Sequence, residues 1–160
     1  MKTQEYKKVK LTNPVHLLAV GFGSGLSPVM PGTMGSIAAI PIWWLFHDIA
    51  PLYYWLIVIV ATIFGCWICQ KTADHIGKAD PGSVVWDEFV GMWIALFFMP
   101  VVSWLWVLAV FVIFRFFDIL KPWPIGWFDQ KIKGGVGIML DDIIAGIFSV
   151  IVIVAIGYFV

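Results

Sequence analysis

Long apolar runs alternate with short polar clusters along this chain. The run Leu52–Cys69 is uncharged and mostly apolar, and the last run, Ile143–Val160, has the same character. Two further runs, Phe89–Met99 and Val101–Phe114, are separated by Pro100. A stretch of about 20 predominantly apolar residues is long enough for one transmembrane helix. The pattern therefore predicts helices that are embedded in a membrane and joined by polar segments.

The first part of the chain is less regular. Asn13 before Pro14 is typical of a helix start, with Asn as the N-cap and Pro at the first helical position, so we expect a short helix over Pro14–Val20. The segment Gly21–Ser36 is rich in Gly, Ser and Pro, which disfavours a regular helix. Irregular backbone cannot face lipid, so this segment should lie within protein or at the water surface. An apolar helix is expected over Ser36–Phe46.

The number of helices between Phe89 and Phe114 decides which polar clusters share a side of the membrane. A single helix would place Lys71–Glu88 and Arg115–Asp142 on opposite sides, and the Lys residues of the second cluster would break the positive-inside rule. Two helices hinged near Pro100 return both clusters to the cytoplasmic side with the basic N-terminus. We therefore predict an all-α fold, a polytopic membrane helical bundle of five embedded helices with cytoplasmic polar loops.

The composition supports a membrane-embedded fold. Of the 160 residues, 61% are hydrophobic and only 12% are charged, whereas a soluble domain has about 25% charged residues. The length predicts one domain over residues 1–160, in which residues 1–12 form a basic cytoplasmic segment. The formal net charge of zero leaves no basic footprint for a nucleic-acid partner. Cys66 and Cys69 lie in an apolar run and are expected to be core residues, and nothing in the sequence sets the oligomeric state.

Acidic residues gather in the polar clusters, next to the apolar runs. Ionisable residues beside hydrocarbon are costly unless they lie at the water boundary or serve a site. Carboxylates with few competing Cys or His ligands favour a hard cation such as Mg²⁺. The candidate metal ligands are Asp87, Glu88, Asp118, Asp129, Asp141 and Asp142. Simpler interpretations stay open, because Asp87 and Glu88 could stabilise a helix N-terminus and Asp142 could cap the last helix.

Basic residues in the second polar cluster are candidates for binding phosphate. Arg115, Asp118 and Lys121 are spaced so that all three can share one face of a helix that ends before Pro122. Arg115 and Lys121 would then bind phosphate oxygens, although a snorkelling Arg with a salt-bridge partner fits the same spacing. The other candidate phosphate ligands are Lys133, the hydroxyl groups of Ser24 and Thr33, with Ser27 and Ser36 in the same loop, and the backbone N–H groups of Gly134, Gly135 and Gly137.

Several phosphatase chemistries are missing from the sequence. It contains no Cys-x5-Arg loop, no Asp-x-Asp nucleophile pair and no Ser-Gly-His arrangement. Water activated by a metal is then the default mechanism for cleavage of a phosphate ester. Two alternatives remain, a small membrane transporter with buried acidic residues and a lipid phosphotransferase. A transporter would place polar residues within the spans, and Leu52–Cys69 has almost none.

Four segments of the chain resemble a known family. They are HLLAVGFGSGLSPVMPGTMGS (His16–Ser36), VVWDEFVGMW (Val84–Trp93), FRFFDILKPWPIGWFD (Phe114–Asp129) and GGVGIMLDDIIAG (Gly134–Gly146). The four segments follow one another in the order and with the spacing of the phosphatidylglycerophosphatase A family, which the chain resembles over about residues 13–146. The four motifs together are specific for this family, whereas the tripeptide Trp86-Asp87-Glu88 alone would be a weak signal.

The resemblance implies a Mg²⁺-dependent lipid phosphatase, multi-pass in the bacterial inner membrane, with its active site on the cytoplasmic side. Such an enzyme hydrolyses the terminal phosphate of phosphatidylglycerophosphate in phospholipid biosynthesis, giving phosphatidylglycerol and inorganic phosphate. Asp87, Glu88, Asp118 and Asp142 would be the catalytic carboxylates of this sequence. The number of metal ions, the identity of the general base and the formation of an aspartyl-phosphate stay open.

Overall fold

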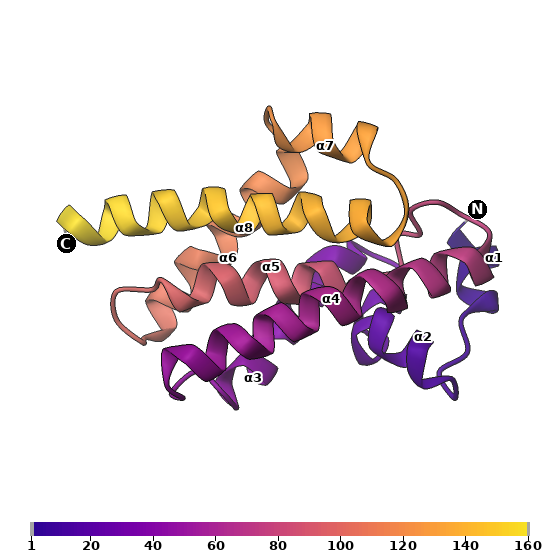
Figure 1. Cartoon of the computed structure of the whole chain (residues 1–160), viewed down its shortest axis with the longest axis horizontal. Helices are drawn as coiled ribbons and strands as arrows, with labels where there is room; N and C mark the ends of the chain where they lie inside the picture. The colour runs from indigo at the N-terminus through magenta and orange to yellow at the C-terminus, as the bar shows by residue number, and fades with distance from the viewer. Residues whose placement is uncertain (1, 160) are drawn as a thin grey trace.

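The computed structural model describes residues 2–159, and every regular element in that range is a helix (Figure 1). The elements are α1 (Lys2–Lys8), α2 (Pro14–Ala19), the 3₁₀ helix η1 (Gly21–Leu26), α3 (Pro31–Trp44), α4 (Pro51–Ile76), α5 (Trp86–Phe97), α6 (Trp104–Leu120), α7 (Ile125–Lys131) and α8 (Gly134–Phe159). The all-α prediction is therefore confirmed. The predicted N-cap is confirmed as well, because Asn13 Oδ1 accepts a hydrogen bond of 2.9 Å from Val15 N.

Helices α4 and α8 are the longest elements, with 26 residues each, or about 39 Å at 1.5 Å per residue. Both are long and apolar enough to cross a membrane. The other described helices are shorter, and the longest of them, α6, has 17 residues. Most of the apolar window of each long helix is not buried by the rest of the chain, so these helices leave wide apolar surfaces exposed.

Helix α5 forms the centre of the bundle and packs against α3, α4, α6 and α8. All of its residues from Trp86 to Leu96 are buried. The Trp93 indole donates to Ala39 O on α3, and the Tyr54 hydroxyl on α4 donates to Trp93 O. A Cβ atom at Gly146 of α8 would come within 2.7 Å of Gly91 O, so small residues allow the two backbones to approach closely.

The chain turns back between α5 and α6, as the position of Pro100 predicts. Residues 98–103 separate the two helices, and Ser103 Oγ caps α6 by accepting a hydrogen bond from Trp106 N. The hairpin brings the start of α5 and the end of α6 to one cavity. Helix α6 ends before Pro122, as expected, with Lys121 in the left-handed region at φ 42°.

Two predicted helix starts are wrong. Helix α3 begins at Pro31 rather than Ser36, because Pro31 occupies the first helical position. A Cβ atom at Gly35 would lie 2.6 Å from Val85 Cβ, so this glycine lets the first turns of α3 pack against the chain before α5. The glycines of Gly21–Ser36 thus serve a helix interface as well as the irregular turn at η1.

Helix α8 begins at Gly134 rather than Ile143, so Asp142 lies inside the helix and does not cap it. Of the three glycines predicted to bind an anion, Gly134 and Gly135 lie against Gln70 and Cys66 of α4, so they allow α8 to cross α4 closely, and Gly137 lies against Ile132 O. Gly135 N donates to Gln70 Oε1 at 2.7 Å, and a Cβ atom at Gly135 would lie 1.9 Å from Cys66 O. The prediction of a free N–H group at Gly135 is therefore wrong.

Candidate functional site

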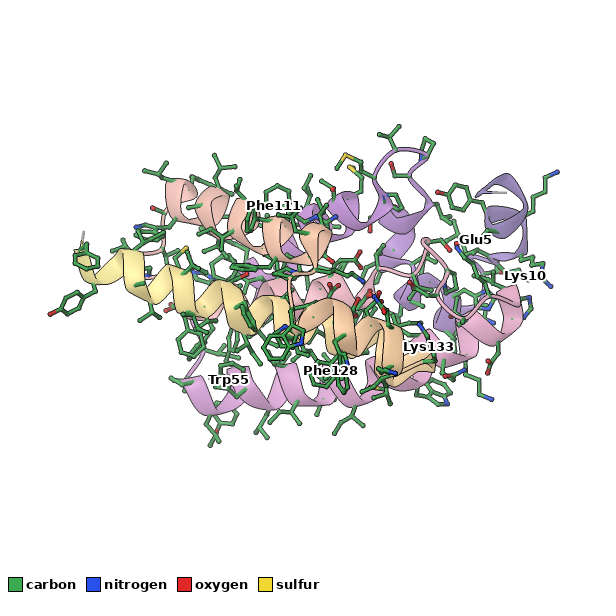
Figure 2. All side chains as sticks on the ribbon, turned by 90° about the horizontal axis from the view of Figure 1, so that it is seen from above. Glu5, Lys10, Trp55, Phe111, Phe128 and Lys133 are labelled. Atoms are coloured by element: carbon green, nitrogen blue, oxygen red, sulfur yellow. The ribbon has the colours of Figure 1, made fainter. Side chains whose placement is uncertain are left out.

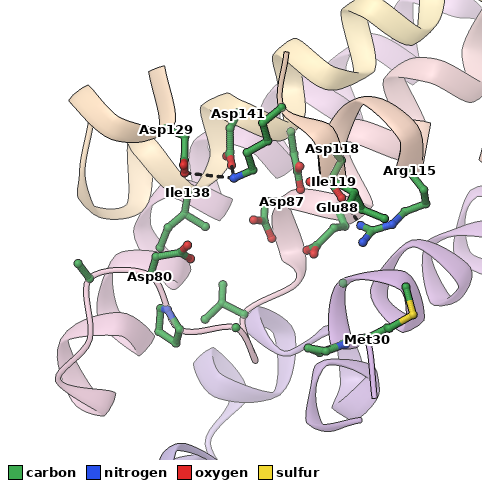
Figure 3. Close-up of a pocket in the computed structure, with 18 of the residues that line it drawn as sticks. Met30, Asp80, Asp87, Glu88, Arg115, Asp118, Ile119, Asp129, Ile138 and Asp141 are labelled. Atoms are coloured by element: carbon green, nitrogen blue, oxygen red, sulfur yellow. Dashed lines mark hydrogen bonds and ion pairs between the residues drawn. The ribbon is translucent and has the colours of Figure 1, made fainter. Parts of the chain in front are cut away.

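A cavity of about 480 Å³ lies where α3 and α5 begin and α6 ends (Figure 3). The loop between α4 and α5, the end of α7 and the first turns of α8 complete its wall. The charged residues that line it are Asp80, Asp87, Glu88, Arg115, Asp118, Lys121, Asp129, Lys133, Asp141 and Asp142. Both polar clusters of the sequence therefore meet in one site, as the hinge near Pro100 predicts.

Three of the predicted metal ligands form a compact trio. Asp87 and Glu88 come from the first turn of α5 and Asp142 comes from α8, and one carboxylate oxygen of each lies within 4.8 Å of the other two. All three residues are buried. Within the described residues, Asp87 Oδ1 and Glu88 Oε2 have no hydrogen-bond partner. Buried carboxylate oxygens without partners are costly, so the trio is suited to a cation.

The electrostatics of the trio agree with this interpretation. Asp87 and Glu88 stand at the cavity end of α5, ahead of its apolar residues. Burial raises the pKa of Glu88 to about 7, and it raises the pKa of Asp87 well above its usual value. The neighbouring carboxylates of Glu88 and Asp142 raise the pKa of Asp87 further. A bound cation would remove this penalty, because it favours the ionised form of each acid.

Arg115 lies beside the trio and is held from two sides. Its Nη1 atom forms an ion pair with Asp118 and donates to Ser36 Oγ at 3.5 Å. Its Nε atom is buried and has no partner in the part of the chain that the structure describes. A guanidinium fixed in this way can bind phosphate oxygens with its remaining donors.

The start of α3 approaches the same place through Gly32. A Cβ atom at Gly32 would lie 2.3 Å from Glu88 Oε1 and 3.2 Å from Arg115 Nη1. The N–H groups in the first turn of a helix have no partner within the helix and favour anions. Gly32 therefore lets a helix N-terminus face the cavity between the carboxylates and the guanidinium.

Lys121 has a different environment from Arg115. Its Nζ atom donates to Asp129 Oδ1 at 3.1 Å and also pairs with Asp141. Burial alone would lower the pKa of Lys121, but the two carboxylates raise it above its ordinary value. Asp129 and Asp141 are thus used in ion pairs, and Asp118 is paired with Arg115. The assignment of these three acids as metal ligands stays a prediction.

The remaining predicted phosphate ligands are less well placed. Lys133 lines the cavity at its rim, where its Nζ atom donates to Asp129 O. Ser24 Oγ donates to Gly21 O, and neither Ser24 nor Thr33 is among the residues that line the cavity. Sequence reasoning missed Gly32, whereas Ser36 was among the predicted hydroxyl groups and contacts Arg115 rather than lining the cavity. The Pro-Gly pair at the start of α3 was the available signal for a close backbone approach.

The fold and the site define a class of protein: an all-helical enzyme that handles phosphate esters next to apolar helices. A family model described as phosphatidylglycerophosphatase A matches residues 17–157, so the chain belongs to the phosphatidylglycerophosphatase A family and is a phosphatase. It is 54% identical over 151 residues to phosphatidylglycerophosphatase A of Escherichia coli (strain K12), covering 94% of this chain and 88% of the relative.

Two further relatives support the assignment. Phosphatidylglycerophosphatase A of Haemophilus influenzae is 51% identical over 153 residues, covering 95% of this chain and 94% of the relative. A Bacteroides thetaiotaomicron protein with a provisional name as a phosphatidylinositol-3-phosphatase is 42% identical over 144 residues, covering 86% of this chain and 89% of the relative. No solved structure matches the chain significantly. Membership of a phosphatase family argues against the two alternative functions, a membrane transporter and a lipid phosphotransferase.

Proposed function

We propose that this protein hydrolyses the terminal phosphate of phosphatidylglycerophosphate to phosphatidylglycerol and inorganic phosphate, in phospholipid biosynthesis. The observation that carries the proposal is the carboxylate trio beside Arg115, in a chain that belongs to this family. The trio can hold a divalent cation and Arg115 can hold the phosphate, so the cavity contains the two functions that cleavage of a phosphate monoester requires.

Mg²⁺ is the cation that suits this donor set. The trio offers only carboxylate oxygens, two of which are buried without partners, and Mg²⁺ prefers oxygen ligands and substrate phosphate. Asp87, Glu88 and Asp142 would hold it. When bound, Mg²⁺ supplies neutralisation of negative charge, polarisation of a phosphoryl oxygen and a lowered pKa of water.

The chain's own residues then bind and orient the substrate. Arg115 binds phosphoryl oxygens, and Asp118 and Ser36 fix the orientation of its guanidinium. The N-terminus of α3 at Gly32 adds a positive partial charge on the same side. A cavity carboxylate accepts a proton from the attacking water, whose oxygen forms the new bond to phosphorus. The bond from phosphorus to the glycerol oxygen breaks, and that oxygen takes up a proton to give phosphatidylglycerol.

We place the protein in the bacterial inner membrane as a multi-pass bundle whose cavity faces the cytoplasm. Figure 2 shows Glu5, Lys10 and Lys133 toward one end of the molecule and Trp55 toward the other. The basic N-terminal segment is tied to the cavity end, because Glu5 Oε1 accepts a hydrogen bond of 3.0 Å from Ser83 N. Positive residues favour the cytoplasmic side, which supports this orientation.

Phosphate release by the purified protein in detergent micelles tests the proposed substrate. We expect phosphatidylglycerophosphate to be hydrolysed with a kcat/KM well above that of phosphatidic acid or phosphatidylinositol 3-phosphate. Preference for phosphatidylinositol 3-phosphate, the substrate in the name of the Bacteroides relative, would contradict the proposal.

A further inference from the structure

The cavity has two unlike rims. Asp80, Asp129 and Lys133 stand on one, which suits contact with water. Met30 and Ile119 stand on the other, and 54% and 56% of their surfaces are exposed. Figure 3 shows Met30 and Arg115 on the side of the cavity opposite to Asp80 and Asp129. A molecule with a charged head and an apolar body would therefore reach the site across the second rim.

The apolar rim lies at the end of the seam between α3 and α6. Met30 immediately precedes α3, and Ile119 lies in the last turn of α6. The two helices touch directly at the cavity, because Arg115 Nη1 on α6 donates to Ser36 Oγ on α3. The seam thus begins where the phosphate is expected to bind.

An apolar groove of about 430 Å³ lies farther along the same pair of helices. Its residues are Ile37, Ile40, Pro41 and Trp44 from α3 and Trp104 from α6. Trp44 and Trp104 stack with ring centroids 5.3 Å apart and an interplanar angle of 1°, at the end of the seam farther from Arg115. Arg115 and Trp104 are 11 residues apart on α6, or about 16 Å at 1.5 Å per residue.

We propose that this α3–α6 groove binds an acyl chain of the lipid substrate while the phosphate lies at Arg115. The inference rests on the proposed function, because it needs a substrate with both a phosphate and a hydrocarbon chain. An acyl chain spans one leaflet, or half of the roughly 30 Å hydrocarbon core. That length matches the distance from Arg115 to the tryptophan stack. The groove would make chain length, as well as the headgroup, a determinant of specificity.

A second apolar groove provides an internal control. It has a volume of about 490 Å³ and lies among α4, α5 and α8, with Trp55, Ile59 and Ile63 in its wall. No residue lines both this groove and the cavity, and none of the groove's residues lies on α3 or α6. A lipid chain held there has no direct connection to Arg115 along the α3–α6 seam.

Matched substitutions test the α3–α6 groove. Ile37 is 45% exposed in this groove and Ile59 is 52% exposed near the control groove, so a larger side chain can be accommodated at either position. The substrates are dioleoyl and dihexanoyl phosphatidylglycerophosphate, at fixed concentration in detergent micelles. Ile37→Trp should lower kcat/KM for the dioleoyl lipid by about tenfold and leave the dihexanoyl lipid within about twofold, because only the long chain fills the groove. Ile59→Trp should leave both rates near the wild-type values.

The outcomes separate this proposal from the proposed function. Equal losses on both lipids, no loss with Ile37→Trp, or chain discrimination with Ile59→Trp would overturn the groove assignment. A wild-type protein that hydrolyses neither lipid would overturn the proposed function instead. If Ile37→Trp does not fold, Trp104→Ala replaces it, since removing this exposed ring from the groove should change dioleoyl kinetics by about threefold or more and spare dihexanoyl kinetics. Unchanged dioleoyl kinetics in Trp104→Ala would also reject the groove.

Discussion

The acidic residues of the cavity divide into two groups with different partners. Asp87, Glu88 and Asp142 lie together, whereas Asp129 and Asp141 share the ammonium group of Lys121. Within the described residues, Asp87 Oδ1, Glu88 Oε2 and the second oxygen of Asp141, Oδ1, are buried without a hydrogen-bond partner. The same division separates the two basic residues. Lys121 is neutralised by two carboxylates, while Arg115 is paired with Asp118 and keeps other donors for an anion.

Arg115 and Lys121 should therefore respond differently to exchange of their head groups. Arg115→Lys should lower kcat/KM for phosphatidylglycerophosphate by about tenfold or more, because a planar guanidinium can hold two phosphate oxygens and an ammonium group cannot. Lys121→Arg should have a milder effect, since its partners are carboxylates of the protein. The test is to measure kcat/KM of both variants on the same lipid micelles. A silent Arg115→Lys beside a severe Lys121→Arg would move the phosphate site to Lys121.

Gly32 offers a second test at the residue scale. Gly32→Ala should lower kcat about tenfold with little change in the melting temperature, because its Cβ atom would displace the Glu88 carboxylate and crowd Arg115 while alanine suits a helix. Gly82→Ala is the matched control, since a Cβ atom at this cavity-lining glycine meets nothing within 4 Å. Similar rates for the two variants would show that the approach of α3 to the trio is unimportant.

At the scale of elements, α1 holds the loop that forms one wall of the cavity. Glu5 Oε1 accepts hydrogen bonds of 3.0 Å from both the N–H and the hydroxyl group of Ser83, which is fully buried. The Tyr6 hydroxyl donates to Ser27 O, which ties the same helix to the segment before α3. Helix α1 therefore supports two segments that carry cavity residues.

Glu5→Ala should lower the melting temperature in detergent and raise KM. It leaves two buried donors of Ser83 unsatisfied, each costing about 1–3 kcal/mol, and it loosens the loop that carries Asp80 and Gly82. Lys7→Ala, at an exposed position on the same helix, is the control for general disturbance of α1. The supporting role of α1 fails if the two variants melt and react alike.

The sequence predicts the elements better than their limits. The apolar runs, the Asn13 cap and the turn at Pro100 are local signals, and each is confirmed. The start of α8 is different, because the role of Gly135 depends on Cys66 and Gln70 on another helix. A glycine that permits a helix crossing and a glycine in a loop look the same in one sequence. The trio was predicted from residue types, whereas its separation from Asp129 and Asp141 depends on where Lys121 points.

At the scale of the whole molecule, the polar clusters should share the cytoplasmic side of the membrane. Single cysteines at Lys78 and Lys131, both exposed at the cavity end, can be introduced in a background without Cys66 and Cys69. Both should resist an impermeant thiol reagent in intact cells and react after permeabilisation. A cysteine at the exposed Asp48, between α3 and α4, should react in intact cells. Labelling of only one of the two cavity-end cysteines in intact cells would refute the arrangement of α5 and α6 across the membrane.

The central claim is that the trio holds the divalent cation for hydrolysis of phosphatidylglycerophosphate. Phosphate release measured over a range of Mg²⁺ concentrations tests it most directly, with Asp142→Asn compared with Asp80→Asn, a cavity acid outside the trio. Asp142→Asn should lower the maximal rate by about a hundredfold and raise the Mg²⁺ concentration for half-maximal rate, because a charged ligand is lost. Asp80→Asn should stay near the wild type. A folded Asp142→Asn protein with the wild-type rate and Mg²⁺ response would contradict the account.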